Sequence, residues 1–416
     1  MPREMKDSGI EWIGEIPSHW ETNRLQWHLE EVKVSNSPIQ SEQVLSLTIE
    51  AGVIPYEEKG NQGNKSKEHY EEYKLAYPNT LVVNSMNVII GAVGISKHFG
   101  CVSPVYYVFR TAPSTDLRYI YYLFTNVGFQ KEMRKYAKGI LEIRLRISAE
   151  DMLKRIIPKP SYEEQKAIAD FLDDRCADID YVIAETKATI EEYKKLKQSV
   201  ITEAVTKGIR GDRPMKDSGI EWIGEIPREW NVKKLKYTST FKQNKYQESD
   251  GDLTYVGLEN IVAWSGKYIT TESIYDKEQS LICEPCDILF GKLRPYLAKV
   301  YLNTERQCCS GEFSVISIQE QNTKYMWYQL ISHGFIFMID RSTYGTKMPR
   351  ANADYIKNMS IAAPPLEEQG EIVFYLDQMC AEIDTLIEKK TALLEEMEAL
   401  KKSIIFEYVT GKKEVC

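Results

Sequence analysis

The sequence predicts a mixed α/β (α+β) fold built as an internal repeat, in which two β-rich segments alternate with two long helices. Residues 5–17 and 215–227 are identical over 13 positions, MKDSGIEWIGEIP, so the chain contains a duplication with an offset of 210 residues. A second repeat begins with EEQ at Glu163 and again at Glu367, an offset of 204 residues. Apolar residues spaced by three, four and seven follow each EEQ, which indicates long helices that pair through a heptad seam.

The two offsets differ by six residues, so the region between the repeated pieces has changed its length. This pattern indicates a fixed frame that carries two variable inserts. At 416 residues the chain is too long for a single ordinary core. We therefore predict an insert-bearing domain, a long helix, a second insert-bearing domain and a second long helix, at residues 1–158, 159–210, 211–363 and 364–416.

Composition is that of a globular protein, with 43% apolar and 27% charged residues. The sequence contains no run of 18 apolar residues, so we expect no membrane-spanning helix and no membrane partner. The first residues lack the apolar stretch of a secretory signal. Eight cysteines without the spacing of a disulfide framework indicate reduced thiols, and we expect a cytoplasmic protein.

The formal net charge of −8 argues at first against binding to nucleic acid, but the charge is unevenly distributed. Residues 161–210 hold 11 acidic and 8 basic residues, and residues 366–416 hold 12 acidic and 6 basic residues. The acidic excess thus lies in the predicted helices. The two inserts are close to neutral, which permits local basic surfaces that bind DNA.

The frame of the first half begins with a turn whose apolar anchor contains Trp12 and Trp20. A stacking platform for bases needs basic neighbours, and acidic residues flank these tryptophans, so we favour packing over base stacking. Alternating or apolar runs then predict strands at Val44–Ile49, Thr80–Val83, Val88–Ile90 and Val102–Phe109. A helix is expected over 117–137, followed by a strand, Leu141–Ile147, with Arg144 and Arg146 on one face.

Polar loops interrupt these strands. Residues 59–67 are rich in glycine, lysine and amides, and amide side chains can pair with adenine edges in a major groove. The same composition also fits a solvated loop, and both interpretations stay open. The candidate DNA-binding residues of the first insert are Lys59, Asn61, Gln62, Asn64, Lys65, Asn84, Asn87, Lys97, His98, Arg144 and Arg146.

The first long helix is expected to begin at Ser161, because Ser161 and Glu164 have the spacing of a capping box. It is expected to end at Lys207, since Gly208 is a plausible C-terminal cap. The second helix follows Pro364-Pro365 and ends near Gly411.

The second half repeats this plan, with strands expected at Thr254–Leu258, Ile288–Phe290 and Phe313–Ile318, and a helix over 323–339. The loop Gly291–Lys299 combines basic residues with a tyrosine, which suits phosphates or bases; it also fits a structural turn. At the offset of 204, Arg350 aligns with Arg146. The candidate residues here are Lys242, Asn244, Lys245, Lys292, Arg294, Tyr296, Lys299, Lys347 and Arg350.

Catalytic motifs are not visible in the sequence. The single Pro-Pro pair, Pro364-Pro365, lacks the flanking residues of an amino-methyltransferase loop, and no glycine-rich nucleotide cradle occurs. The five histidines form no obvious pair of base and nucleophile. Cys283, Cys286, Cys308 and Cys309 could be zinc ligands, but adjacent cysteines suit such a site poorly, and we predict no metal site.

These motifs, taken together and in order, resemble the specificity (S) subunit of Type I restriction–modification systems. The resemblance rests on the repeated MKDSGIEWIGEIP, on the EEQ that opens each long helix, and on Gly291–Leu297, Ser310–Phe313 and Gly345–Arg350 in the second insert. Asn84–Asn87 through Pro104 forms the matching signature in the first insert. It covers essentially the whole chain.

The resemblance implies two target-recognition domains with curved sheets, joined by two long antiparallel coiled-coil helices with an internal pseudo-two-fold repeat. Each domain would read one half of a bipartite double-stranded DNA target. The chain itself would be non-catalytic and without a cofactor. It would recruit two modification subunits, which use S-adenosylmethionine, and restriction subunits, which use ATP and magnesium. Two alternatives remain: a self-contained DNA methyltransferase or nuclease, and a coiled-coil scaffold without a role on DNA.

Overall fold

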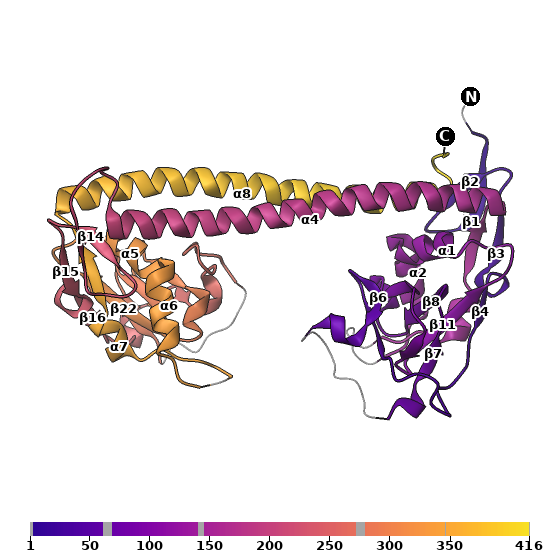
Figure 1. Cartoon of the computed structure of the whole chain (residues 1–416), viewed down its shortest axis with the longest axis horizontal. Helices are drawn as coiled ribbons and strands as arrows, with labels where there is room; N and C mark the ends of the chain where they lie inside the picture. Colours follow the sequence, from indigo (N-terminus) through magenta and orange to yellow (C-terminus); the bar gives the residue numbers. More distant parts are fainter. Residues whose placement is uncertain (1–2, 61–68, 140–144, 272–278, 346, 416) are drawn as a thin grey trace. The chain divides into compact units, whose positions relative to one another are not determined.

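The computed structural model describes residues 3–60, 69–139, 145–271, 279–345 and 347–415. The chain divides into two compact units (Figure 1). Unit 1 consists of Met1–Thr186 with Ala392–Cys416, and unit 2 consists of Lys187–Thr391. Two long helices, α4 (Tyr162–Lys207) and α8 (Leu366–Val409), each contribute one segment to both units.

The centre of unit 1 is a four-stranded antiparallel sheet with the strand order β4-β11-β8-β9. Three helices and four two-stranded sheets, β1-β2, β3-β12, β5-β6 and β7-β10, accompany it among the described residues. The bounds are β1 Met5–Ile10, β2 Gly14–Pro17, β3 Glu21–Arg24, β4 Leu29–Glu31, β5 Leu45–Thr48, β6 Gly52–Pro55, β7 Lys74–Ala76, β8 Thr80–Asn84, β9 Val93–Ser96, β10 Gly100–Val102, β11 Tyr106–Thr111, α1 Leu117–Thr125, α2 Val127–Tyr136, α3 Ala149–Leu153 and β12 Ile156–Lys159.

Unit 2 repeats this topology. Its central sheet has the order β16-β22-β19-β20, which matches unit 1 strand for strand, and it adds a three-stranded sheet, β17-β21-β18. The bounds are β13 Met215–Asp217, β14 Glu225–Pro227, β15 Asn231–Lys234, β16 Ser239–Lys242, β17 Tyr255–Val256, β18 Leu281–Cys283, β19 Ile288–Gly291, β20 Val300–Leu302, β21 Gln307–Cys309, β22 Phe313–Ile318, α5 Thr323–Ile331, α6 His333–Arg341, α7 Ala353–Asn358 and β23 Ser360–Ala363.

The repeated tryptophans hold the start of each frame against the start of a long helix. Trp20 is 1% exposed and its indole N–H donates to Glu164 over 3.1 Å. In unit 2, Trp230 is fully buried and donates to Glu368 over 2.9 Å. A buried indole with its N–H satisfied contributes large apolar contact area without a desolvation penalty. The predicted packing role of Trp20 is therefore confirmed.

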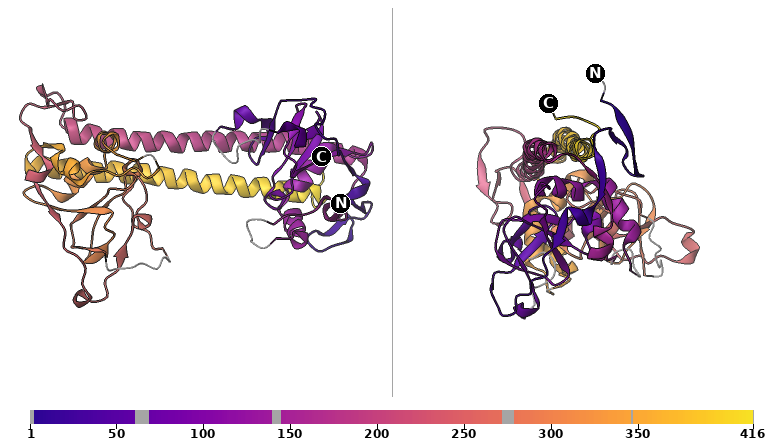
Figure 2. Two further views of the ribbon diagram at one scale, coloured as in Figure 1. Left: turned by 90° about the horizontal axis from the view of Figure 1, so that it is seen from below. Right: turned by 90° about the vertical axis from the view of Figure 1, so that its right-hand side faces the viewer.

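The long helices run antiparallel within each unit (Figure 2). In unit 1 the Nζ of Lys401 on α8 lies 2.6 Å from Asp180 on α4, and in unit 2 Lys197 on α4 lies 2.8 Å from Asp384 on α8. The predicted capping box is present, because the Ser161 amide donates to the Glu164 carboxylate and the Glu164 amide donates to the Ser161 hydroxyl. The first helix ends at Lys207, as predicted, where Gly208 has a φ of +75°.

Some expected elements differ from the observed ones for local reasons. The helix expected over 117–137 is divided into α1 and α2, because Asn126 is extended and its side chain accepts from the first amides of α2. The helix expected over 323–339 is divided at Ser332, which is also extended, but its hydroxyl donates back to the carbonyl of Gln329 over 2.7 Å and does not cap α6. Val88–Ile90 is a 3-10 helix that ends at Gly91 with a φ of +84°, and not a strand.

Two of the expected strands are also shorter or broken. The strand expected at Val102–Phe109 is interrupted by a turn between β10 and β11. The strand expected at Thr254–Leu258 narrows to β17, because Leu258 already begins a 3-10 helix.

Among the described residues, no helix is both long enough and apolar enough to cross a membrane.

Candidate nucleic-acid interface

The loop that follows β19 pairs with the segment that precedes α7 in unit 2. Leu293 and Tyr344 each form an isolated β-bridge with Arg350. The Arg294 amide donates to the carbonyl of Pro349 over 2.7 Å. This pairing brings the exposed residues Arg294 and Arg350 into neighbouring positions. We call the described residues of the two paired segments, 291–299 with 344, 345 and 347–350, the unit 2 rim.

Some basic side chains of the unit 2 rim have partners within the protein. Arg350 forms an ion pair with Glu312. The ammonium of Lys292 donates to the carbonyl of Gly311 over 2.7 Å, and that of Lys299 donates to a carbonyl of the adjacent loop over 2.6 Å. Burial lowers the pKa of both lysines. These two ammonium groups therefore brace the rim, whereas Arg294 and Lys347 are exposed to solvent.

The backbone of this rim is strained, and it presents an aromatic ring. Arg294 and Ala298 have φ values of +50° and +45°, a left-handed conformation that costs non-glycine residues about 1–3 kcal/mol each. They flank the 3-10 helix Pro295–Leu297, in which Pro295 is buried and Tyr296 is 44% exposed. The surrounding contacts thus hold Tyr296 on the surface, next to basic side chains.

Three other candidates of unit 2 lie apart from this rim. Lys242, on β16, forms an ion pair with the buried carboxylate of Asp287 at 2.8 Å. Asn244 and Lys245 are exposed and follow β16, and Lys245 forms an isolated bridge with Leu281 on β18. Lys242 is therefore held in an internal ion pair, and Asn244 and Lys245 are the exposed side chains here that suit DNA.

Unit 1 has an equivalent rim at the end of β8, the counterpart of β19. Lys138 and Arg146 form an isolated β-bridge, and the Ile147 amide donates to the carbonyl of Ser85 over 3.1 Å. In unit 2 the Ala351 amide donates to the carbonyl of Lys292 in the same way. We call residues 84–90 together with Lys138 and 145–147 the unit 1 rim.

Among the candidates of the unit 1 rim, Arg146 and Asn87 are exposed, whereas Asn84 is buried. The Asn84 side chain accepts from the Met86 amide and shapes the turn. The strand expected over Leu141–Ile147 is not seen at residues 145–147, where Arg146 makes only an isolated bridge. Its other predicted basic residue, Arg144, lies outside the described residues.

The remaining candidates of unit 1 belong to two loops. Lys59 lies over the ring of Tyr56, with 5.3 Å between its Nζ and the ring centroid. Lys97 is exposed beside His98, whose backbone is held by hydrogen bonds with the Ser96 hydroxyl. The rest of the first loop lies outside the described residues, namely Asn61, Gln62, Asn64 and Lys65.

Two basic residues near the unit 1 rim are missing from the sequence-based prediction. Lys138 forms a bridge with Arg146, as Tyr344 does with Arg350 in unit 2. Lys74 donates to the carbonyl of Tyr106 over 2.7 Å. Burial lowers the pKa of Lys74, and the charge of Arg146 lowers it further. The offset of 204 aligns Lys138 with Ser342 and so does not reveal it, and no local pattern marks Lys74.

The cysteines considered as zinc ligands lie in and near the small sheet of unit 2. Cys283, Cys308 and Cys309 are buried on β18 and β21, and Cys286 is exposed. Within the ranges that the structure describes, no cluster of three or more histidine, cysteine or acidic residues is arranged to hold a metal ion.

A duplicated frame with two divergent inserts defines a tandem-domain protein. The family model of the Type I restriction modification DNA specificity domain matches residues 27–192 and 227–396. These matches cover most of the chain, so the protein belongs to this family and carries two copies of its domain. The resemblance that the sequence motifs predicted is thereby confirmed.

Curated relatives carry matching names. The chain is 28% identical over 273 residues to the Type I restriction enzyme MjaVIII specificity subunit of Methanocaldococcus jannaschii, which covers 62% of this chain and 61% of the relative. It is 23% identical over 272 residues to the Type I restriction enzyme EcoDI specificity subunit of Escherichia coli, again over 61% of each. The chain thus spans about three fifths of the length of these two relatives. A putative MjaX specificity subunit aligns over 95% of its length at 24% identity.

Solved structures share the fold. A chain from a study of complex assembly and conformational transition of the type I R-M system has a TM-score of 0.69 at 14% identity, covering 96% of this chain and 99% of that one. The HsdS subunit of Thermoanaerobacter tengcongensis has a TM-score of 0.50 at 15% identity, covering 96% and 98%. At this level of identity the comparison establishes the fold alone: mixed α/β, with two domains and two long helices.

Proposed function

We propose that this chain is the specificity subunit of a Type I restriction–modification assembly and recognises a bipartite double-stranded DNA target. One observation carries this proposal: each unit has a rim, and the two rims lie at equivalent positions of the duplicated frame. The unit 2 rim presents Arg294, Tyr296 and Arg350, whereas the unit 1 rim presents Asn87 and Arg146. Different side chains on the same scaffold support two different half-sites. Arginine and asparagine are the side chains that most often read guanine and adenine edges.

Other candidates have supporting positions in this proposal. The exposed residues Lys97, Asn244, Lys245 and Lys347 bind phosphates, and the bracing residues Lys292 and Lys299 hold the unit 2 rim in shape. Phosphate contacts fix orientation and affinity, whereas base contacts specify the sequence. The domain limits at 158, 210 and 363 remain part of the proposal, with 159–210 and 364–416 as the helices that set the gap.

The proposed partners are two modification subunits, which methylate adenine with S-adenosylmethionine, and restriction subunits, which use ATP and magnesium. The chain itself takes no cofactor and performs no catalysis, and it acts in the cytoplasm, where its DNA target lies. Family membership supports the partners as a class, and the repeated frame offers two similar surfaces to two copies of one partner.

An exchange of one insert tests this function. Residues 21–157 are replaced by the corresponding insert of a relative, and the chain is expressed with its modification subunit. The methylated motif, mapped by sequencing of modified adenines, is expected to change in one half only, because the second insert is untouched. A change in both halves, or in neither, would contradict separate half-site recognition.

Two further measurements separate the alternatives. Methylation or cleavage by the purified chain alone would indicate a self-contained enzyme. The absence of salt-dependent DNA binding in the presence of the partners would indicate a scaffold, because binding through phosphates releases counterions and weakens with salt.

A further inference from the structure

Glu312 lies beside the unit 2 rim and forms an ion pair with Arg350. The Lys292 amide donates to the carbonyl of Glu312 over 2.9 Å, which ties this residue to the rim. The side chain of Arg350 is 48% exposed and that of Glu312 is 31% exposed, so a ligand can reach both. A carboxylate repels the phosphates of DNA, and a rim that bound only phosphates would gain nothing from it.

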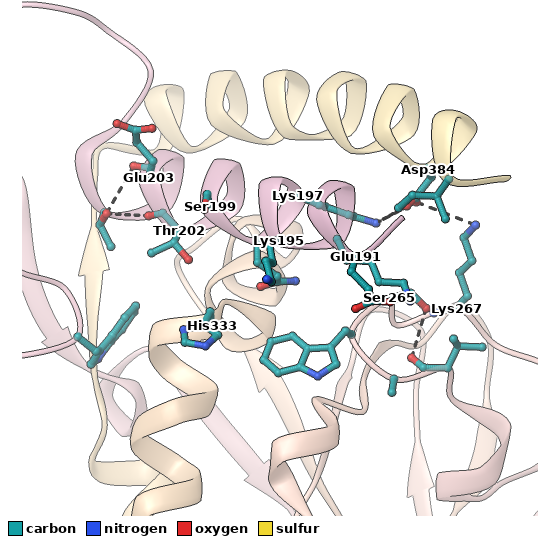
Figure 3. A pocket seen from close by; sticks show the side chains of 18 of the residues that line it. Glu191, Lys195, Lys197, Ser199, Thr202, Glu203, Ser265, Lys267, His333 and Asp384 are labelled. Atoms are coloured by element: carbon teal, nitrogen blue, oxygen red, sulfur yellow. Dashed lines mark hydrogen bonds and ion pairs between the residues drawn. The ribbon is translucent and has the colours of Figure 1, made fainter. Parts of the chain in front are cut away.

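The ion pair leaves hydrogen-bonding atoms of both side chains open to a ligand. Nη2 of Arg350 donates to Oε1 of Glu312. Among the described residues, neither Nη1 of Arg350 nor Oε2 of Glu312 has a hydrogen bond. An ion pair beside the cavity of Figure 3 differs in this respect, because Lys197 donates there to both carboxylate oxygens of Asp384. The pair at the rim thus keeps guanidinium donors and one carboxylate acceptor in adjacent positions.

A row of two donors and one acceptor matches one base pair in the major groove. Read from the guanine, a G·C pair presents two acceptors, N7 and O6, and then the N4 donor of cytosine. Arginine donates to both guanine acceptors, and glutamate accepts from the cytosine amine. An A·T pair instead sets its N6 donor against the guanidinium and its O4 acceptor against the carboxylate. Unpaired groups of this kind cost free energy, so the row favours G·C.

The repeat shows that unit 1 has a different side chain at this position. Tyr106 and Phe313 begin equivalent strands, β11 and β22, and the amide of each donates to the carbonyl of the serine three residues earlier. The residues before them, Val105 and Glu312, therefore correspond. Valine has no side-chain acceptor, so Arg146 of unit 1 lacks a carboxylate at the equivalent position.

We propose that Glu312 is a specificity-determining residue, which reads the cytosine of a G·C pair whose guanine is read by Arg350. The Oε2 of Glu312 accepts from the N4 amine of cytosine, while Arg350 donates to N7 and O6 of guanine. Because unit 1 has Val105 instead, its half-site is read without this contact. The inference rests on the proposed function, since it assigns one base pair to a rim that the proposed function places on DNA.

The recognition sequence of the wild-type complex gives the first test. The chain is expressed with its modification subunit, and the methylated motif is mapped. The half-site of unit 2 is the half that stays constant when residues 21–157 are exchanged. It is expected to contain an invariant G·C pair. A bipartite motif without such a pair in this half would overturn the role of Glu312 and leave the proposed function intact.

A base analogue tests the contact at the level of single atoms. In each invariant G·C pair of this half-site, cytosine is replaced by 2-pyrimidinone, which lacks the N4 amine and keeps the guanine edge. Binding of the wild-type complex is expected to weaken by about tenfold at one position. Glu312→Val, which copies unit 1, is expected to lower the response at that position to about twofold or less, because the acceptor for N4 is gone. Any weakening of the duplex by the analogue is the same in both complexes and cancels in the comparison.

A matched ion pair away from the rim supplies the control. Glu221 pairs with Arg341 at 3.1 Å, and Glu221→Val is expected to keep the full response to the analogue. Melting temperatures of the variant chains show that both are folded. An equal response of the wild type and Glu312→Val would mean that Glu312 only orients Arg350, and no response of the wild type at any pair would also overturn the proposal. If the wild-type complex does not prefer its own target, the proposed function fails first.

Discussion

Arg350 joins the two segments of the unit 2 rim through its backbone and carries one of the rim's exposed charges. Its backbone bridges Leu293 and Tyr344, and its guanidinium pairs with Glu312. The carboxylate repels phosphate and fixes the orientation of the guanidinium. If the proposed function holds, we expect Arg350 to read guanine and not to make a simple phosphate contact.

Replacing Arg350 with alanine is therefore expected to weaken DNA binding by the assembled complex by about 1–3 kcal/mol and to relax one position of the second half-site. The measurements are binding titrations at several salt concentrations and a methylome. Arg341→Ala is the control, because Arg341 pairs with Glu221 at 3.1 Å and lies outside the rim. Equal weakening for all sequences, with a smaller salt slope, would assign Arg350 to phosphate instead.

Glu164 links the frame of unit 1 to the start of α4, and it is predicted to make stability depend on pH. Burial alone would raise the pKa of Glu164, but hydrogen bonds from His19, Trp20 and Ser161 outweigh it and lower the pKa to about 2. A carboxylate with a lowered pKa stabilises the fold above the unfolded value, near pH 4.3, and this contribution is lost as pH falls toward 2.

Glu164→Gln is accordingly expected to destabilise unit 1 by about 1–3 kcal/mol at pH 7, after allowance for partial solvent screening, and by progressively less as pH falls below about 4. Urea denaturation at pH 7, 5 and 3 measures this. The neighbouring exposed Glu163→Gln serves as the control. An equal loss of stability at pH 7 and pH 3 would show that the charge of Glu164 does not matter.

At the scale of elements, two ion pairs fix the antiparallel register of α4 and α8, one in each unit. They are related by the repeat, since Lys197 corresponds to Lys401 and Asp180 to Asp384. Their surroundings differ: the side chains of Lys197 and Asp384 are 13% and 27% exposed, whereas those of Lys401 and Asp180 are 31% and 55% exposed. The same ion pair is thus more buried in unit 2 and more exposed to solvent in unit 1.

Double-mutant cycles with Lys→Met and Asp→Asn compare the two pairs by thermal and chemical unfolding. The Lys197–Asp384 pair is expected to show a coupling energy of about 1–2 kcal/mol, because loss of one partner leaves a partly buried charge. The more exposed Lys401–Asp180 pair is expected to show about 0.5 kcal/mol or less. Equal coupling in both cycles would mean that burial does not set the strength of these pairs.

The long helices could be predicted from sequence because their information is local: a heptad seam, a capping box at Ser161 and a glycine after Lys207. The inserts were harder, because capping and glycine conformations override apolar periodicity there, as at Asn126 and Gly91. The rims depend on pairing between segments far apart in sequence. The repeat aligned Arg146 with Arg350, but only the fold shows that Lys74 lies nearby, since no local pattern marks it.

At the scale of the whole molecule, the proposed function makes α4 and α8 the ruler of the gap between half-sites. Inserting four residues mid-seam in both helices is expected to lengthen the gap by one to two base pairs, because four residues add about 6 Å and DNA rises roughly 3.4 Å per base pair. Four residues nearly complete a turn, so the apolar seam keeps its register. The half-sites should stay the same in the methylome. An unchanged gap with full activity would place the control of spacing in the partner subunits.

Unit 1 is built from two separated stretches of the chain, and this affects how it folds during synthesis. Its core includes Ile405 and Val409 from the end of α8, and the buried Tyr119 hydroxyl donates to the carbonyl of Val409 over 3.1 Å. All of unit 2 leaves the ribosome before Ala392, so unit 2 can fold during synthesis. Unit 1 cannot close its core until the end of α8 emerges. At typical rates of about 5–20 residues per second, the intervening residues of unit 2 take roughly 10–40 s to synthesise. For that time the apolar surface of Tyr119 and its neighbours stays open to aggregation or to a chaperone.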